Sequence, residues 1–123
     1  MFFIETFAKI KLAIEASKEV NRQRHHDAKM ERYRRSQLNR QDMKIAYDTA
    51  NKMSQDFDLQ QFCWGPGAAR NPAAQLRIAQ EYENAGALMS ALAQYEKAAK
   101  LGSAEAKAWV AQNKDSVRKA YLM

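Results

Sequence analysis

The residues that could do chemistry are His25, His26 and Asp27, which are adjacent, and Cys63, the only cysteine. Imidazole and carboxylate groups are zinc ligands, so the first three suggest a metal site. Adjacent side chains on a helix point about 100° apart, however, so the two histidines cannot hold one tetrahedral ion unless the helix unwinds. We interpret the pair as a solvated part of a basic helix, and we expect no metal and no cofactor.

Cys63 could be a nucleophile if a histidine and an orienting carboxylate or amide lay beside it. The only two histidines lie far upstream in a polar stretch. We therefore interpret Phe62, Cys63 and Trp64 as an apolar wedge that closes a helix end, with the cysteine a small buried hydrophobe. Because no phosphate-binding loop, dinucleotide fingerprint or paired-carboxylate signature occurs either, the sequence predicts a protein that is not an enzyme.

The strongest charge signal lies between Arg22 and Lys44, where eight basic and three acidic residues give +5 of the formal net charge of +6. Arginine pairs with phosphates or carboxylates, and Tyr33 could stack on a base or an apolar partner. Asp27 and Glu31 lie within the segment, and their negative charges favour a solvated face or a protein contact over nucleic-acid binding. Nucleic-acid binding remains an alternative. The predicted binding residues of this basic helix are Arg22, Arg24, Lys29, Arg32, Tyr33, Arg34, Arg35 and Arg40.

The elements that carry these residues are predicted to be helices, because no proline or glycine precedes Gly65. An apolar stripe at spacings of four, three and four opens the first helix, at Phe3, Phe7, Ile10 and Ile14. We favour packing in the core as the explanation of this stripe. Two alternatives remain: the stripe contacts a membrane interface, or it forms a short seam in a dimer. No run of about 18 apolar residues occurs, so we expect no membrane-spanning segment.

Asn39 is predicted to cap a new helix, with Asp42 reaching back to its free amides. A stripe at spacings of three and four follows and is predicted to be buried: Met43, Ala46, Ala50, Met53 and Phe57.

The stretch FCWGPGAARNP, residues 62–72, then breaks the helical pattern. Its glycines permit a turn, Asn71 and Pro72 suit the cap and first position of the next helix, and Phe62 with Trp64 is expected to pin the joint to the core. The sequence thus predicts an N-terminal helical region at 1–61, a hinge at 62–72 and a helical module at 73–123. With 123 residues, these parts are expected to form one compact domain.

The module has small and aromatic residues at regular intervals on two helices separated by a turn at Asn84 to Gly86. They are Ile78, Ala79 and Tyr82 on the first helix, and Ala91, Tyr95 and Ala98 on the second. Residues 72–105 resemble one unit of the tetratricopeptide superfamily, and the run from Lys97 to Ala99 with Gly102 and Ala106 is similar to its Sel-like branch. Gln75 and Ser103 depart from the family's tryptophan and proline positions. A further helix with Ala106, Val110, Val117 and Tyr121 follows as a cap.

This resemblance implies a non-catalytic adaptor, accessory subunit or small inhibitor that docks on a partner protein or complex. The family usually binds through a concave helical surface. The candidate surface here is the first helix of the repeat, with the exposed positions Gln75, Arg77, Gln80 and Glu81. The alternative is a protein associated with nucleic acid or the ribosome through the basic helix. Association of the chain into a homo-oligomer is also compatible with the sequence. A single cysteine gives no argument for an oxidising compartment, so we expect the cytoplasm.

Overall fold

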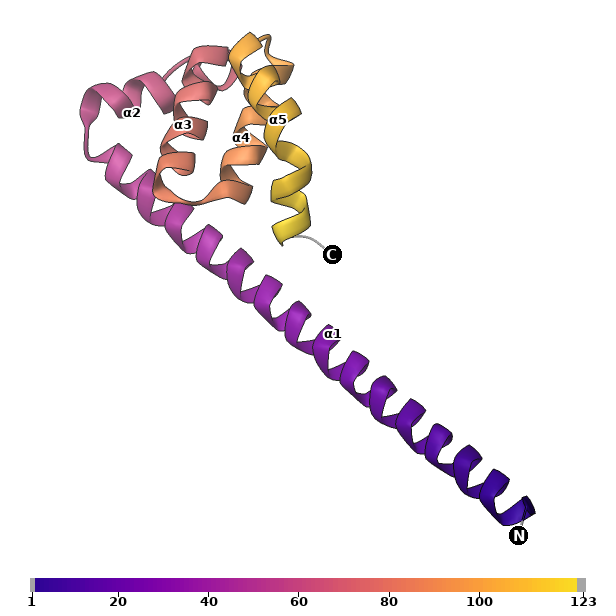
Figure 1. Ribbon diagram of the computed structural model, residues 1–123. Helices are drawn as coiled ribbons and strands as arrows, with labels where there is room; N and C mark the ends of the chain where they lie inside the picture. Colours follow the sequence, from indigo (N-terminus) through magenta and orange to yellow (C-terminus); the bar gives the residue numbers. More distant parts are fainter. Residues whose placement is uncertain (1, 122–123) are drawn as a thin grey trace. The chain divides into compact units, whose positions relative to one another are not determined.

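The computed structural model describes residues 2–121, without the side chains of residues 2–5 and 7, and it is all-α in that range (Figure 1). The elements in chain order are α1 (Phe2–Ser54), α2 (Phe57–Trp64), the 3-10 helix η1 (Ala68–Arg70), α3 (Pro72–Ala85), α4 (Leu88–Lys100) and α5 (Ala104–Tyr121). The predicted fold class is therefore confirmed.

The chain forms two compact units that meet within α1, one ending at Arg34 and the other beginning at Arg35. The division expected from the sequence, at residues 62–72, lies instead inside the second unit. The new helix expected at Asn39 is also wrong, because α1 continues through this residue. Asn39 Nδ2 donates to the carbonyl oxygens of Arg35 and Tyr121, both at 2.9 Å, so its side chain serves helix contacts rather than a cap.

The first unit is one helix, and its side chains from Ala8 to Arg34 are exposed except that of Glu31, which is half-buried. Ile10 and Ile14 are 53% and 52% exposed, so the prediction that they pack in a core is wrong. Phe3 and Phe7 of the same stripe lie outside the described side chains. Pairs three or four residues apart support this polar helix, among them Glu31 with Arg34 at 2.6 Å.

The core of the second unit lies where α3, α4 and α5 pack side by side (Figure 1). Its first cluster consists of four alanines and one tyrosine: Ala79, Ala91, Tyr95, Ala98 and Ala106. Alanine lets helices approach closely, and the Tyr95 ring stacks on Trp109 with ring centroids 4.0 Å apart. A second cluster joins Met53 of α1, Cys63 of α2 and Ile78 of α3. Met53 and Cys63 thus tie the preceding helices to α3.

The stripe expected over residues 43–57 is buried only in part. Met53 is buried and Ala46 and Ala50 are half-buried, but Met43 and Phe57 are each 71% exposed. Phe57 is misplaced because α1 ends at Ser54, so the helical phase is lost before α2 begins. Met43 is exposed because its neighbour Asp42 faces the interior, and adjacent helical positions point about 100° apart.

Asp42 does not cap the helix that carries it. Its carboxylate accepts hydrogen bonds from Met89 N at 2.7 Å, from Ser90 N at 3.1 Å and from Ser90 Oγ. These groups open α4, whose N-cap residue is Ala87 and offers no capping side chain. Asp42 therefore supplies from α1 the cap that α4 lacks, and a negative charge is favourable at that end of a helix.

The turn between α2 and α3 forms largely as predicted. Gly67 has φ of +80°, and Asn71 Oδ1 accepts from Ala73 N at 3.0 Å with Pro72 as the first helical residue. Of the three residues expected to pin this joint, only Cys63 is buried, while Phe62 and Trp64 are 43% and 45% exposed. Consecutive residues of α2 point in different directions, so one of the three can face α3.

Candidate partner-binding surfaces

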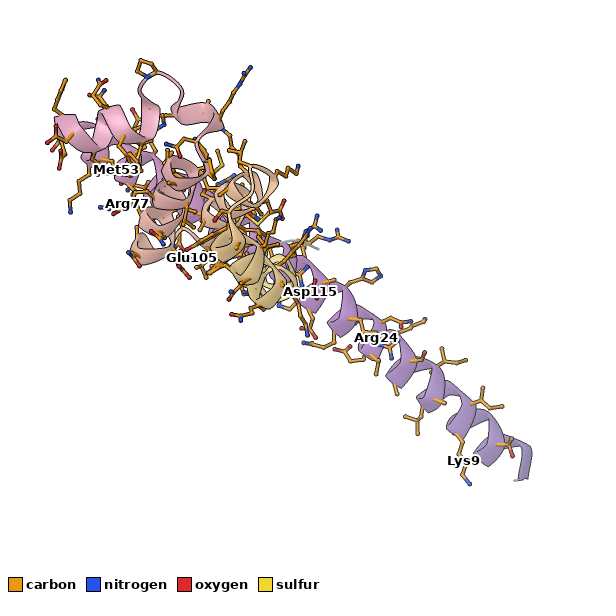
Figure 2. All side chains as sticks on the ribbon, turned by 90° about the horizontal axis from the view of Figure 1, so that it is seen from above. Lys9, Arg24, Met53, Arg77, Glu105 and Asp115 are labelled. Carbon is orange, nitrogen blue, oxygen red and sulfur yellow. The ribbon has the colours of Figure 1, made fainter. Side chains whose placement is uncertain are left out.

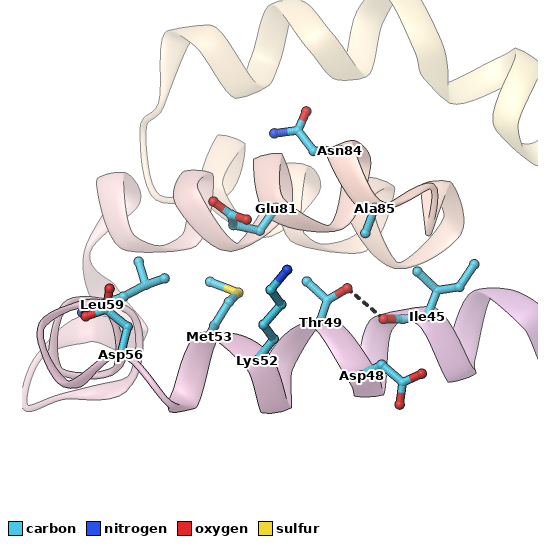
Figure 3. Close-up of a pocket in the computed structure, with 10 residues that line it drawn as sticks. All are labelled: Ile45, Asp48, Thr49, Lys52, Met53, Asp56, Leu59, Glu81, Asn84 and Ala85. Carbon is cyan, nitrogen blue, oxygen red and sulfur yellow. Dashed lines mark hydrogen bonds between the residues drawn. The ribbon is translucent and has the colours of Figure 1, made fainter.

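A groove of about 640 Å³ lies in the second unit, among the C-terminal part of α1, α2 and α3 (Figure 3). Apolar groups from all three helices line it: Ile45 and Met53 of α1 and Leu59 of α2 lie at its base, and the exposed Ala85 of α3 lies on its edge. Met53 is buried, and Ile45 and Leu59 are half-buried. The groove therefore offers apolar surface that no residue described in this chain fills.

Charged groups surround this apolar base. Asp48, Asp56 and Glu81 contribute carboxylates, and Lys52 contributes the one ammonium among the lining residues. Figure 3 shows Lys52 extending from α1 toward α3. Asp56 Oδ1 also accepts from Leu59 N at 3.2 Å and so caps α2. The rim carries an excess of negative charge, which suits a partner with basic side chains next to apolar ones.

A second, more polar groove of about 520 Å³ follows the α3 face that the repeat resemblance indicates. Arg77, Gln80 and Glu81, three of the four residues predicted for the repeat surface, line it. Arg77 Nε donates to Glu81 Oε1 at 3.0 Å, and Gln80 Nε2 donates to Glu105 Oε1 of α5 at 3.3 Å. Glu81 and Asn84 line both grooves, so these two residues are common to the two candidate surfaces.

Gln75, the fourth predicted residue of this surface, is not available to a partner. It is 3% exposed, and its Nε2 donates to Ala68 O at 3.0 Å. The prediction of an exposed Gln75 is wrong, because its amide satisfies a carbonyl oxygen of η1 inside the fold.

Glu83, which sequence reasoning did not identify, organises the other wall of the polar groove. Its two carboxylate oxygens accept from Tyr95 Oη at 2.8 Å and from Trp109 Nε1 at 2.7 Å. Burial, then the hydrogen bond to Glu83, raises the pKa of Tyr95 well above its ordinary value, so the hydroxyl keeps its proton. No local sequence pattern predicts this cluster, because Glu83, Tyr95 and Trp109 lie on three different helices.

The residues predicted for the basic helix are exposed, apart from Arg35, which is half-buried. They do not form one surface, because their positions are distributed around the helix. In unit 1, Arg22 pairs with Glu19 at 3.3 Å and Arg34 pairs with Glu31. Arg24 and Lys29 make no ion pair with any residue that the structure describes. Figure 2 shows Arg24 extending away from α1.

His25 and His26 are exposed, whereas Cys63 is 1% exposed and lines a small cavity of about 220 Å³. Burial raises the pKa of the Cys63 thiol, and the nearby Arg77 opposes this only in part. The thiolate, which is the nucleophilic form, is thereby disfavoured. Within residues 2–121, side chains described by the structure form no group of three or more metal-ligating residues.

Comparisons of the chain with known protein families, curated proteins and solved structures give no match. Across the described helices, none has both the length and the apolar character needed to cross a membrane.

Proposed function

We propose that the protein is a non-catalytic helical module that binds a partner protein, as an adaptor, an accessory subunit or a small inhibitor. The observation that carries this proposal is the groove among α1, α2 and α3, with its apolar base and charged rim. Binding sites for amphipathic helices combine these two features, because apolar anchors fill the base while charges on the partner face the rim.

The partner that fits best presents an amphipathic helix with apolar side chains flanked by lysine or arginine. Asp48, Asp56 and Glu81 outnumber Lys52 around the groove, so basic flanks would be favoured and acidic ones repelled. The resemblance of residues 72–105 to a tetratricopeptide unit supports the same kind of function, since that family binds proteins through its helical surfaces. We propose a cytoplasmic location for this module.

A catalytic role for the only thiol has little support. Cys63 packs with Met53 and Ile78, and its raised pKa leaves it protonated at neutral pH. Burial and the neutral state are what a small core residue requires, and they are the opposite of what a nucleophile requires.

The groove can be blocked at Ala85, an exposed residue on its edge. The variant Ala85→Arg should lose the protein partner that the wild-type chain captures from its host, and purified partner should bind at least tenfold more weakly. Ala93→Arg is a matched control on α4, because Ala93 is exposed and lines none of the three cavities described above. Equal retention of the partner by both variants would refute a role for the groove.

A further inference from the structure

One face of α1 is basic between Lys18 and Tyr33. Lys18, Arg22, Lys29 and Tyr33 follow one another at intervals of four, seven and four residues, which keeps them within an arc of about 60° on a helix that turns about 100° per residue. His26 lies in the same direction, and all five side chains are exposed. We call these five residues the basic face.

The acidic residues of the segment lie away from the basic face. Asp27 and Glu31 are displaced from Arg22 by about 140° and about 180° around the helix. Both are also engaged there, since Asp27 Oδ1 accepts from Gln23 Nε2 at 3.0 Å and Glu31 pairs with Arg34. The carboxylates that weakened a nucleic-acid interpretation of the sequence therefore do not interrupt this face.

Two other acidic residues lie closer to the basic face: Glu15 lies in the same direction, about one turn before Lys18, and Glu19 lies at the edge of the face. The pair of Glu19 with Arg22 spans 3.3 Å between side chains that are 73% and 76% exposed. Exposed pairs of this kind contribute little and exchange readily, so Arg22 can turn to another anion.

The composition of the basic face distinguishes among anionic partners. It has no leucine, isoleucine, phenylalanine or tryptophan, although protein interfaces depend on such buried anchors and membrane-surface helices insert them. Three cations with an aromatic ring at one end suit a regular series of phosphates, where the ring can stack on a base. From Lys18 to Tyr33 the face is about 22 Å long at the helical rise per residue, enough to meet several phosphates.

We propose that the basic face of α1 binds the phosphate backbone of a nucleic acid, with Lys18, Arg22 and Lys29 as the phosphate contacts. This site lies on residues up to Arg34, whereas the groove proposed for a partner protein lies on residues from Arg35 onward. Either proposal can therefore fail without deciding the other.

The test compares two triple variants of the full chain with equal changes in net charge. The first combines Lys18→Gln, Arg22→Gln and Lys29→Gln on the basic face. The control combines Lys9→Gln, Arg24→Gln and Arg34→Gln, at positions about 120° to 200° around the helix from Arg22. Glutamine has a helix propensity similar to that of lysine and arginine, and circular dichroism checks that α1 is retained.

Fluorescence anisotropy with a labelled single-stranded RNA and a labelled DNA duplex measures affinity between about 50 and 200 mM NaCl. The wild-type chain should bind, with an affinity that falls steeply as salt rises. The basic-face variant should bind at least tenfold more weakly, and its slope of log K against log salt should be smaller in magnitude by about 2 to 3. The control should keep most of the affinity and slope.

Three outcomes would overturn the proposal. One is no binding of either nucleic acid by the wild-type chain at the lowest salt. Another is equal loss in the two variants, which would indicate attraction by net charge rather than by a face. The third is binding of phosphatidylserine vesicles, but of neither nucleic acid, which would identify a lipid surface as the partner.

Discussion

Burial holds four ionisable side chains of the second unit in their neutral forms. It is the main cause that raises the pKa values of Cys63, Tyr82, Tyr95 and Tyr121. In Tyr95 the hydrogen bond to Glu83 adds to this effect, because it requires the hydroxyl proton. These groups therefore retain protons in the folded chain at a pH where the unfolded chain has begun to release them.

We expect the free energy of unfolding to fall as the solution becomes alkaline. A folded-state pKa above the unfolded value means that the stabilisation is complete below the unfolded pKa, which is about 8.5 for a thiol and about 10 for a phenol, and is lost as pH rises through the folded value. Urea unfolding followed by circular dichroism at several pH values above neutrality measures this decline. Tyr95→Phe should make the decline shallower, and an unchanged pH profile in that variant would contradict the assignment.

Single-residue predictions from the sequence succeeded for the small and aromatic residues of α3 and α4. Ala79, Ala91, Tyr95 and Ala98 are buried, as their spacing indicates. The predictions failed for large apolar residues such as Ile10 and Phe57, which are exposed, and for polar groups with a partner far along the chain. Gln75 resembled an exposed residue because nothing local shows that its amide would meet the carbonyl oxygen of Ala68.

At the scale of elements, α4 depends on a group from α1. Sequence rules place a cap within a few residues of the helix that it serves, so Asn39 and Asp42 indicated a helix start near their own positions. Asp42 in fact caps a helix that begins 46 residues later, at Leu88. The all-α class and the helices after Pro72 could be predicted from local patterns, but the extent of α1 and this connection required the tertiary structure.

Asp42→Ala should lower the free energy of unfolding by about 1–3 kcal/mol, because it leaves the first amides of α4 without their acceptor in a half-buried position. Urea denaturation of the full chain measures the change. Asp48→Ala is the control, since Asp48 is exposed on the same helix and should change stability by no more than about 0.5 kcal/mol. Equal effects of the two substitutions would show that the cap is unimportant.

On the scale of the whole molecule, every buried apolar residue among those described lies between Met53 and Val117. The sequence could not locate the division within α1, because helix-forming composition continues on both sides of Arg34 and Arg35. What differs between the sides is burial, and burial depends on helices from the second half of the chain.

A chain that begins at Arg35 should therefore fold by itself. We expect its urea midpoint, followed by the fluorescence of Trp64 and Trp109, to match that of the full chain, with free energies of unfolding within about 0.5 kcal/mol. The shortened chain should retain the protein-binding groove and lose the nucleic-acid affinity. A large loss of stability would mean that the residues before Arg35 are part of the folding unit.

The cap that Asp42 provides has consequences both for the order in which helices form during folding and for hydrogen exchange at the start of α4. Because 47 residues separate Asp42 from Met89, the contact forms only after a long loop has closed. Until then the first amides of α4 have no protein acceptor and are left to water, so the first turn of α4 is less stable before α1 packs against it. We therefore expect the amide protons of Met89 and Ser90 to exchange with solvent mainly when α1 separates from α4, rather than by the fraying that is usual at a helix end.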